Sequence, residues 1–433
     1  MWELIRINKR NSILLMLAMA IVLLTLGYLI GAAIFGVHTK MAMQRHGTVH
    51  PPHSGISPGG MIGIAIAAIL WMILALISFT SGDQIFLATS GAKQVTKDVH
   101  PQLFNVVEEM TIAASLPNMP KIYIINDPAP NAFATGRSPR SASVAVTAGL
   151  LARMNRDELQ GVIAHEVSHI LHRDILFVTV AGIMLGSIVL LSQVFLRGMF
   201  YSSMMGGSRR RYSSGSGGSS GGAAQLVIFA IAILFAILAP IFAYLLYFAL
   251  SQRREYLADA GAARLTRYPE GLASALEKIA DNASPLAGAN KVTAPMYIAN
   301  PLKVKGNHLA DLTSTHPPIS QRVKILRNMT HGASFNNYSQ AFTAVTGSRR
   351  AIPVSALKDT ETVEIRKGQA PEAASGKKQQ ARQVGDIMRR VNQFAFLTCS
   401  CGLMMKIPPN FKTSQVRCPR CGAISPTKTK TAG

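Results

Sequence analysis

Two histidines one helical turn apart flank a glutamate in the run His165-Glu166-Val167-Ser168-His169 of this 433-residue chain. Side chains at positions i and i+4 of a helix share a face, so both imidazoles can bind one zinc ion. Glu166 lies beside them, placed to take a proton from a metal-bound water. Zinc lowers the pKa of that water to about 7, which makes hydroxide available to attack a carbonyl. The run therefore predicts a hydrolytic zinc site, with exposed helical histidines as the alternative.

A hydrolytic zinc site also needs a third protein ligand and an open fourth position. Glu255, in the run Glu255-Tyr256-Leu257-Ala258-Asp259, is a candidate for that ligand. Asp259 follows one turn later on the same helix face, where it can hydrogen-bond a ligating histidine and fix its tautomer. Asp174, just past the first helix, is expected to do the same.

A histidine and a cation follow in a third region of the chain. His316 precedes two prolines, and Arg322 comes six residues later. A tetrahedral oxyanion needs a hydrogen-bond donor to stabilise it. His316 is therefore a candidate hydrogen-bond donor in catalysis, and Arg322 is a cation from the same region of the chain.

All four cysteines lie near the C-terminus, as Cys399, Cys401, Cys418 and Cys421. Two close pairs fit a zinc ribbon, in which four thiolates hold one structural zinc ion. The first pair has one intervening residue where two are usual, and disulfides or free thiols are the alternatives. We expect structural zinc in a module that docks a substrate, a partner or nucleic acid.

Composition places these sites in a membrane protein. Only 15% of the residues are charged, against about 25% in typical soluble chains, and the mean hydropathy is +0.24. These values exclude an ordinary soluble enzyme and a disordered chain, and four cysteines exclude a disulfide-dense secreted scaffold. The net charge of +23 indicates that the protein binds an anionic partner or lies at a membrane.

Four apolar stretches are near or above the roughly 20 residues that a spanning helix needs. They cover residues 13–34, 61–79, 175–196 and 223–250. The first two are expected to span the membrane. The last two interrupt the catalytic region and are expected either to span or to form a re-entrant or interfacial hairpin.

Basic residues near the first two spans predict the orientation. Arg6, Lys9 and Arg10 precede the first span, and Lys93 and Lys97 follow the second. Both flanks are therefore expected in the cytoplasm. The chain is expected to be a multi-pass protein of the inner (cytoplasmic) membrane, with its active site facing the cytoplasm. Arginines in the 197–222 connection would break this charge rule if both later segments span.

The run of residues 80–174 has the pattern of a compact domain. Residues 121–126 and 143–147 are typical of β-strands, and Asn155 with Glu158 predicts a capped start for the metal-binding helix. The second strand is expected to be an edge that pairs with extended substrate through Ser143, Val144, Ala145 and Val146. Asn131 is expected either to cap a turn or to contact the substrate backbone.

The expected domains are a transmembrane hairpin (1–93), a metalloprotease domain (94–347) interrupted by a hydrophobic hairpin (175–250), a polar basic linker (348–392) and a zinc-ribbon-like module with tail (393–433). Residues 346–433 carry an excess of eleven positive charges. Such a run is a solvated tail, a lipid-binding segment or a nucleic-acid module. Nucleic acid is the least expected, because few aromatic residues accompany the charges.

Together these residues resemble the HtpX-type membrane zinc metalloproteases, relatives of the CAAX prenyl proteases. The resemblance covers about residues 1–327. It includes the two N-terminal spans, the His165–His169 motif with Asp174, and the two apolar stretches 175–196 and 223–250 that interrupt the catalytic region. It also includes the runs 131–136, 255–259 and 315–318. It implies an α+β membrane protein with a mainly helical gluzincin core and a small β-sheet. It also implies a cytoplasm-facing active site and endoproteolysis of misfolded or membrane proteins in quality control.

The resemblance implies roles for individual residues. His165, His169 and Glu255 would bind the catalytic zinc, and Glu166 would be the general base. His316 would stabilise the transition state, and Arg322 would be structural. Proteins or peptides would be the substrates.

Two other readings remain open. A membrane adaptor with an inert core would use the ribbon and basic tail to bind a partner, but it would be expected to have lost Glu166 or a ligand. A prenyl-protein protease is less expected, since such enzymes have more spans.

Overall fold

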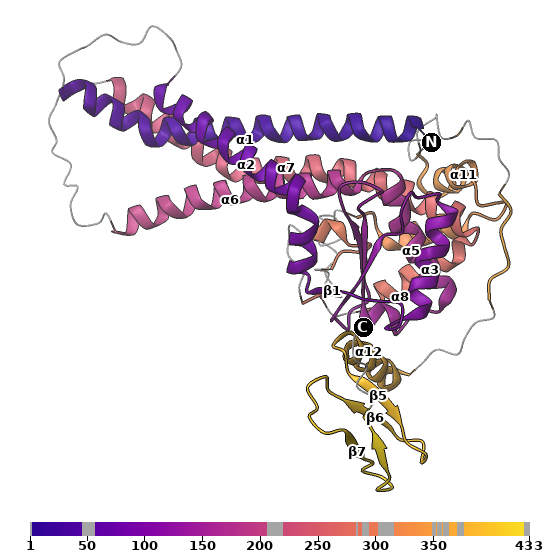
Figure 1. The fold of residues 1–433 in the computed structure, drawn as a ribbon. Coiled ribbons are helices and arrows are strands. Elements are labelled where there is room, and N and C mark those ends of the chain that lie inside the picture. Colours follow the sequence, from indigo (N-terminus) through magenta and orange to yellow (C-terminus); the bar gives the residue numbers. More distant parts are fainter. Residues whose placement is uncertain are drawn as a thin grey trace.

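The computed structural model describes residues 2–45, 57–205, 220–282, 285–287, 294–301, 316–348, 352, 357, 363–369 and 376–427. Figure 1 shows a bundle of long helices that projects from a globular part, with the C-terminal strands on the far side of that globular part.

The bundle consists of α1 (Trp2–Arg45), α2 (Pro58–Thr89), α6 (Ile175–Met205) and α7 (Ser220–Thr266). Each contains a stretch that is long and apolar enough to cross a membrane. α1 packs against α2, α6 and α7, and α2 packs against α6. The four expected apolar segments are thus helices of one bundle, in which the last two pack against the first two.

Glycines allow α1 and α2 to approach closely. A Cβ added to Gly63 would lie 2.0 Å from the carbonyl oxygen of Gly27, and one added to Gly31 would lie 2.7 Å from the Cα of Gly63. No side chain fits between these backbones. Small residues give membrane helices this close contact in the absence of a hydrophobic driving force.

The bundle continues into the globular part without a break. α6 begins at Ile175, directly after Asp174, and α7 runs on past its apolar stretch to carry Glu255 and Asp259. The long apolar helices α6 and α7 therefore position one candidate ligand, Glu255, and its neighbours Asp259 and Asp174.

A four-stranded sheet forms one side of the globular part. Its strands β1 (Ala92–Gln94), β2 (Lys121–Ile125), β3 (Ala132–Thr135) and β4 (Ser143–Thr147) have the spatial order β1-β2-β4-β3. β2 and β4 are parallel, and the other pairs are antiparallel. The two strands expected from the sequence are present, and the two short outer strands were not expected.

The expectation that residues 143–147 form an edge strand was wrong. β4 pairs with β2 on one side and with β3 on the other, and Ser143, Val144, Ala145 and Val146 are all buried. Because its backbone groups are already paired, β4 cannot add a substrate strand. The outer strand next to it is β3.

Helices pack against this sheet and build the core. α3 (Pro101–Ala113) packs on α5 (Arg156–Leu171), which also contacts β3, α7 and α8 (Pro269–Ala280). The short helices α4 (Ala148–Leu151) and η1 (Ala294–Met296) connect these elements, and α10 (Ile319–Arg327) and α11 (Phe335–Thr346) complete the domain. The capping box at Asn155 and Glu158 is present, so α5 begins where the sequence predicts.

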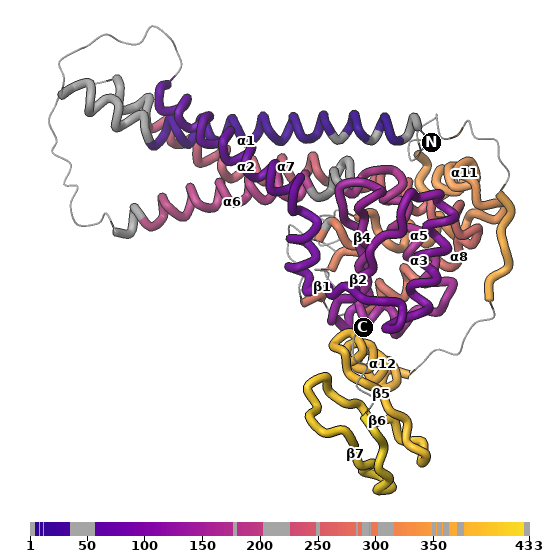
Figure 2. The backbone as a smooth tube through the Cα atoms, in the orientation of Figure 1, coloured from indigo at the N-terminus to yellow at the C-terminus, as the bar shows by residue number. Residues whose placement is uncertain are grey.

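The C-terminal extension folds onto this domain. Residues 363–369 are extended, α12 (Lys377–Val391) follows, and the strands β5 (Ala395–Thr398), β6 (Met404–Ile407), β7 (Gln415–Arg417) and β8 (Ile424–Pro426) form two hairpins. Figure 2 shows α12 between the globular part and these hairpins. Met388 of α12 is buried in the core of the domain, with Val384, Ile387 and Val391 packed against it. The polar segment expected to be a linker therefore contains a packed helix, although much of 349–375 lies outside the described residues.

Candidate metal centre and active site

His165 and His169 point their Nε2 atoms at one place. The two atoms lie 3.2 Å apart, and the helix α5 that carries both side chains is buried along most of its length. One helical turn separates the residues, so the geometry follows directly from their spacing on α5.

Glu255 of α7 completes a group of three candidate ligands. Its Oε2 lies 3.6 Å from His165 Nε2 and its Oε1 lies 3.6 Å from His169 Nε2. Ligands about 2.0–2.1 Å from a tetrahedral zinc ion lie about 3.3–3.4 Å from one another. The observed separations match the edges of such a tetrahedron, and within the described residues this is one of two groups that have the composition and spacing to hold a metal ion.

Both histidines are oriented by carboxylates. Asp259 Oδ1 lies 3.0 Å from His165 Nδ1, and Asp174 Oδ2 lies 3.1 Å from His169 Nδ1. A proton on each Nδ1 is thereby stabilised, which leaves each Nε2 lone pair for a metal ion. The expected positions of Asp259 and Asp174 are those the structure shows.

Arg322 is fully buried and neutralises the carboxylates behind the ligands. It donates hydrogen bonds from Nε and Nη2 to Asp259 at 2.8 and 2.7 Å, and from Nη1 to the carbonyl of Ile298 at 2.8 Å. Its Nη1 also lies 3.3 Å from Glu255 Oε2. Although burial opposes its charge, the Asp259 carboxylate outweighs burial and raises the pKa of Arg322. Arg322 thus holds Asp259, which in turn holds His165.

Glu166 is buried beside the ligands, and its Oε1 has no hydrogen-bond partner within the described part of the chain. Burial raises the pKa of Glu166, while the nearby histidines and a backbone hydrogen bond from Ala134 of β3 oppose that shift. An unpartnered buried acceptor with a raised pKa is suited to take a proton from a reacting water.

Carboxylates also change the protonation of the histidines. Burial lowers the pKa of His169, but Asp174 outweighs burial and raises this pKa to about 9. Burial likewise lowers the pKa of His165, but the hydrogen bonds that His165 donates to the Asp259 and Glu255 carboxylates raise this pKa overall. Because a metal ion binds neutral imidazole, it must displace these protons.

His316 lies at the same centre. It is buried, and its Nδ1 is 3.2 Å from Glu255 Oε2. The structure therefore brings His316 against Glu255, one of the three candidate ligands, from the third region of the chain that the sequence indicates. Thr315, the residue before it, lies outside the described part of the chain.

Asn131 directly precedes β3, and its side chain forms hydrogen bonds within the protein. Its Nδ2 donates to the carbonyl of Ala299 at 3.0 Å, and its Oδ1 accepts from the backbone N–H of Ala132 at 3.0 Å. These bonds fit the turn-capping alternative. Asn131 and His316 also line one small cleft, and contact of Asn131 with substrate stays a prediction.

Sequence reasoning did not identify β3 as part of the site. β3 lies against α5, and its Ala134 contacts Glu166. The outer side of β3 is partly paired, because Phe133 bridges Tyr297 and Ala132 accepts a hydrogen bond from Ile298. The four residues of β3 do not alternate between apolar and polar side chains, so the sequence did not indicate a strand there. Only their place within the run 131–136, which belongs to the family resemblance, indicated that they are important.

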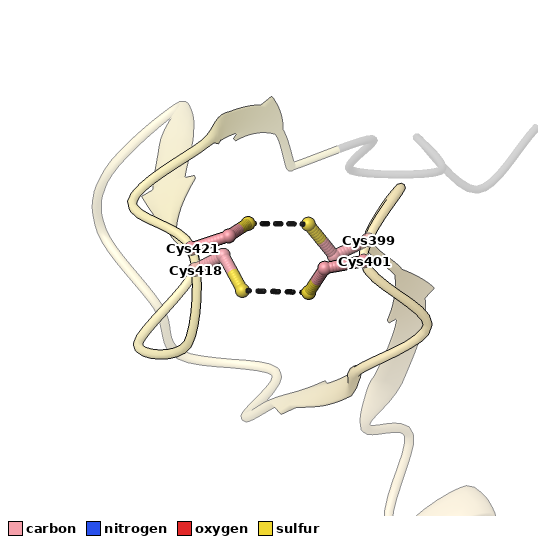
Figure 3. A group of neighbouring side chains, drawn as sticks. All are labelled: Cys399, Cys401, Cys418 and Cys421. Atoms are coloured by element: carbon pink, nitrogen blue, oxygen red, sulfur yellow. Dashed lines mark hydrogen bonds between the residues drawn. The ribbon is translucent and has the colours of Figure 1, made fainter.

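The four cysteines form the second candidate metal group. Figure 3 shows their sulfurs facing one another, with Cys399 3.4 Å from Cys421 and Cys401 3.6 Å from Cys418. All four are free thiols in this structure, and thiolates about 2.3 Å from a tetrahedral zinc ion lie about 3.8 Å apart. The arrangement fits a zinc-ribbon-like module.

Known proteins are similar to this chain in sequence. The sequence model of peptidase family M48 matches residues 97–330. A protease HtpX homolog of Dictyoglomus turgidum is 48% identical over 270 residues, which cover 62% of this chain and 83% of that protein. A protease HtpX homolog of Listeria monocytogenes is 41% identical over 330 residues, which cover 76% of this chain and 100% of that protein.

One solved structure is also similar, the crystal structure of S. mikatae Ste24p. Its TM-score is 0.36 and its sequence identity is 18%, over 68% of this chain and 63% of that chain, a likeness too weak to define a fold. The family match covers more than half of the chain and contains His165, His169 and Glu255. The chain therefore belongs to peptidase family M48 and is a membrane metallopeptidase.

Proposed function

We propose that the protein is a zinc endopeptidase of the cytoplasmic membrane that cleaves misfolded or membrane proteins in quality control. The observation that carries this proposal is the group of His165, His169 and Glu255 with Glu166 beside it. Two nitrogen donors and one carboxylate are the ligand set of many hydrolytic zinc sites, and the spacing of the donor atoms fits tetrahedral zinc. We assign a second, structural zinc ion to the four cysteines.

When bound, the catalytic zinc supplies Lewis-acid chemistry, because it lowers the pKa of a coordinated water and polarises the scissile carbonyl. Glu166 takes the proton from the attacking water at a carboxylate oxygen and returns it to the leaving amine nitrogen. His316 donates a hydrogen bond to the carbonyl oxygen as negative charge develops there. Asp259 and Asp174 keep the histidines in the tautomer that exposes Nε2.

The proposed orientation rests on the two ends of the bundle. Figure 1 places the N-terminal end of α1 beside the globular part, and Arg6, Lys9 and Arg10 lie near that end. Short basic flanks remain in the cytoplasm. The globular part, with the active site, would therefore face the cytoplasm.

Casein cleavage by the detergent-purified protein tests the activity. Wild type and Glu166→Gln are stripped with a chelator and reloaded with zinc. We expect wild type alone to cleave casein, and the variant to lose about 10²–10⁴-fold in rate while it retains zinc. Equal rates would overturn the proposed role of Glu166, and the absence of cleavage by zinc-loaded wild type would overturn the proposed endopeptidase activity.

The cysteines offer a test of the orientation, because all four lie in the C-terminal module. After removal of zinc, a membrane-impermeant maleimide is expected to label them in inverted vesicles and not in right-side-out vesicles. The reverse pattern would place the active site outside the cytoplasm.

A further inference from the structure

A polar cleft of about 530 Å³ lies between α12 and the catalytic domain. Residues at the starts of α3 and α5 and Lys278 of α8 form one wall, and the face of α12 that carries Gln379, Gln383 and Arg390 forms the other. The match to family M48 ends at residue 330. One wall therefore belongs to the peptidase domain and the other to the C-terminal extension.

Arg153 lies in the wall that belongs to the peptidase domain. No carboxylate among the described residues forms an ion pair with its guanidinium group. Its Nη1 donates to the Oδ1 of Asn282 at 3.0 Å, which is a neutral acceptor. Burial lowers the pKa of Arg153, as expected for a guanidinium that has lost part of its hydration without gaining an anionic partner.

Arg390 brings a second charge from the α12 wall. Its guanidinium lies 5.1 Å from the centre of the Phe396 ring. Within the described part of the chain, no carboxylate is within ion-pair distance of Arg390. The stacking fixes the guanidinium at the cleft but leaves its charge uncompensated.

The other charges at the cleft are already paired. Lys278 donates to Glu158 Oε2 at 2.7 Å. The Asp386 carboxylate accepts from Arg389 at 3.2 Å and also from Lys406. The excess charge in the cleft is therefore that of Arg153 and Arg390, one from each wall.

Neutral hydrogen-bond donors also line the cleft. His100 accepts the backbone N–H of Leu103 at Nδ1, at 3.2 Å, so the proton of the neutral ring is on Nε2. The side-chain amides of Gln102, Gln379 and Gln383 also line the cleft. Among the described residues, no phenylalanine, tyrosine or tryptophan lines the cleft, so this lining offers no platform on which a nucleobase would stack.

We propose that this cleft binds a phosphate group, held between Arg153 and Arg390. Two guanidinium groups on opposite walls require ionised oxygens that point in more than one direction, which a phosphate has and a single carboxylate lacks. The volume lies in the range of about 300–1,000 Å³ typical of ligand sites. The phosphate belongs either to a soluble compound or to an anionic phospholipid headgroup, and it would join the extension to the peptidase domain.

Calorimetric titration of the full-length, zinc-loaded protein with inorganic phosphate tests the site. The protein is held in phosphatidylcholine nanodiscs at constant ionic strength, with chloride as the control anion. We expect saturable phosphate binding that weakens about tenfold in Arg153→Gln and in Arg390→Gln. Arg382→Gln, on the same helix but outside the cleft, should bind as wild type does.

The proposal would be overturned if titration with phosphate released the same heat as titration with chloride. It would also be overturned if neither Arg153→Gln nor Arg390→Gln weakened phosphate binding. Casein cleavage by each variant shows that the domain is folded, since none of the three arginines belongs to the catalytic machinery. Nanodiscs that contain phosphatidylglycerol identify the source. If the headgroup of phosphatidylglycerol occupies the cleft, wild type binds inorganic phosphate more weakly in these discs than in phosphatidylcholine discs, and Arg153→Gln shows no such difference. If wild type binds phosphate equally in both kinds of disc, the natural ligand is a soluble phosphate compound.

Discussion

Asp259 Oδ1 lies 3.0 Å from Nδ1 of His165, and neither side chain is exposed to solvent. The carboxylate is itself held by two hydrogen bonds from Arg322. The position of one candidate metal ligand, His165, is therefore fixed by residues on three elements, α5, α7 and α10. A change behind the ligands is expected to alter metal binding without touching the metal ion.

Asp174→Asn is expected to weaken zinc binding at the catalytic site about 10–100-fold. The amide oxygen still accepts from His169 Nδ1, but the negative charge that makes the imidazole a stronger ligand is lost. Zinc affinity is measured by competition with a chromogenic chelator. Asp281→Asn, at the exposed end of α8, is the matched control, and equal affinities in the two variants would contradict this role of Asp174.

Zinc affinity should rise with pH between about 7 and 9. The pKa of His169 in the metal-free protein is raised to about 9, so at lower pH zinc must displace a proton. One displaced proton makes the apparent affinity rise about tenfold per pH unit. The same raised pKa stabilises the metal-free fold below the ordinary histidine value of about 6.5, and this stabilisation is lost as the pH rises through 9.

Two measurements check this pH dependence. Calorimetry in buffers of different ionisation enthalpy counts the protons that zinc releases at pH 7.5, and at least one is expected. Thermal unfolding from pH 6 to 9.5 should show the metal-free protein becoming less stable with rising pH. A proton count of zero would show that His169 is already neutral.

Spacing along helices made the metal site predictable. His165 and His169 are one turn apart, and Glu255 and Asp259 repeat that spacing on a second helix, so each pair shares a face whatever the tertiary fold. That the two faces meet depends on the packing of α5 against α7. Only the resemblance to a known family, and not the spacing, could indicate that contact.

Non-local pairing made the sheet order unpredictable. β4 has the alternation of an exposed edge strand, yet it pairs with β2 on one side and β3 on the other, and all five of its residues are buried. α12 was missed for a different reason, because its polar composition concealed apolar residues at helical spacing, at Val384, Ile387, Met388 and Val391. That periodic signal was present in the sequence and was outweighed by composition.

Arg322→Met is expected to destabilise the catalytic domain by about 3–5 kcal/mol. The substitution keeps much of the side-chain volume but leaves the buried carboxylates of Asp259 and Glu255 without their cation. Arg327→Met, on the same helix, removes exposed ion pairs with Glu270 and Glu277 and should cost about 1 kcal/mol or less. Thermal unfolding in detergent compares the two, and an equal loss in both would show that the buried pair contributes no more than a surface pair.

Gly63→Leu is expected to separate α1 from α2. The added side chain would overlap the backbone of Gly27. Overpacking of this kind lowers the stability by about 1–3 kcal/mol or more. Gly198→Leu is the matched control, because it lies in the apolar stretch of α6 with no atom within 4 Å of an added Cβ. The fraction of protein that remains folded after detergent extraction should fall in the first variant only, and an equal fall in both would rule out close packing as the cause.

Arg366→Gln is expected to release the extended segment 363–369 from the peptidase domain. Arg366 donates to Asp157 at 2.7 Å, to Gln160 at 2.6 Å and to the carbonyl of Thr266 at 3.0 Å. Glutamine cannot reach all three acceptors, so the buried Asp157 loses a charged partner, at a cost of about 1–3 kcal/mol.

Limited proteolysis measures the release of this segment, with Lys367→Gln as the control at the exposed neighbouring position. We expect cleavage near residue 366 to become faster in Arg366→Gln and to stay slow in Lys367→Gln. Equal rates would show that α12 alone holds the extension in place. Because Asp157 lies in the first turn of α5, faster cleavage together with weaker zinc binding would further show that the extension stabilises the helix that carries His165 and His169.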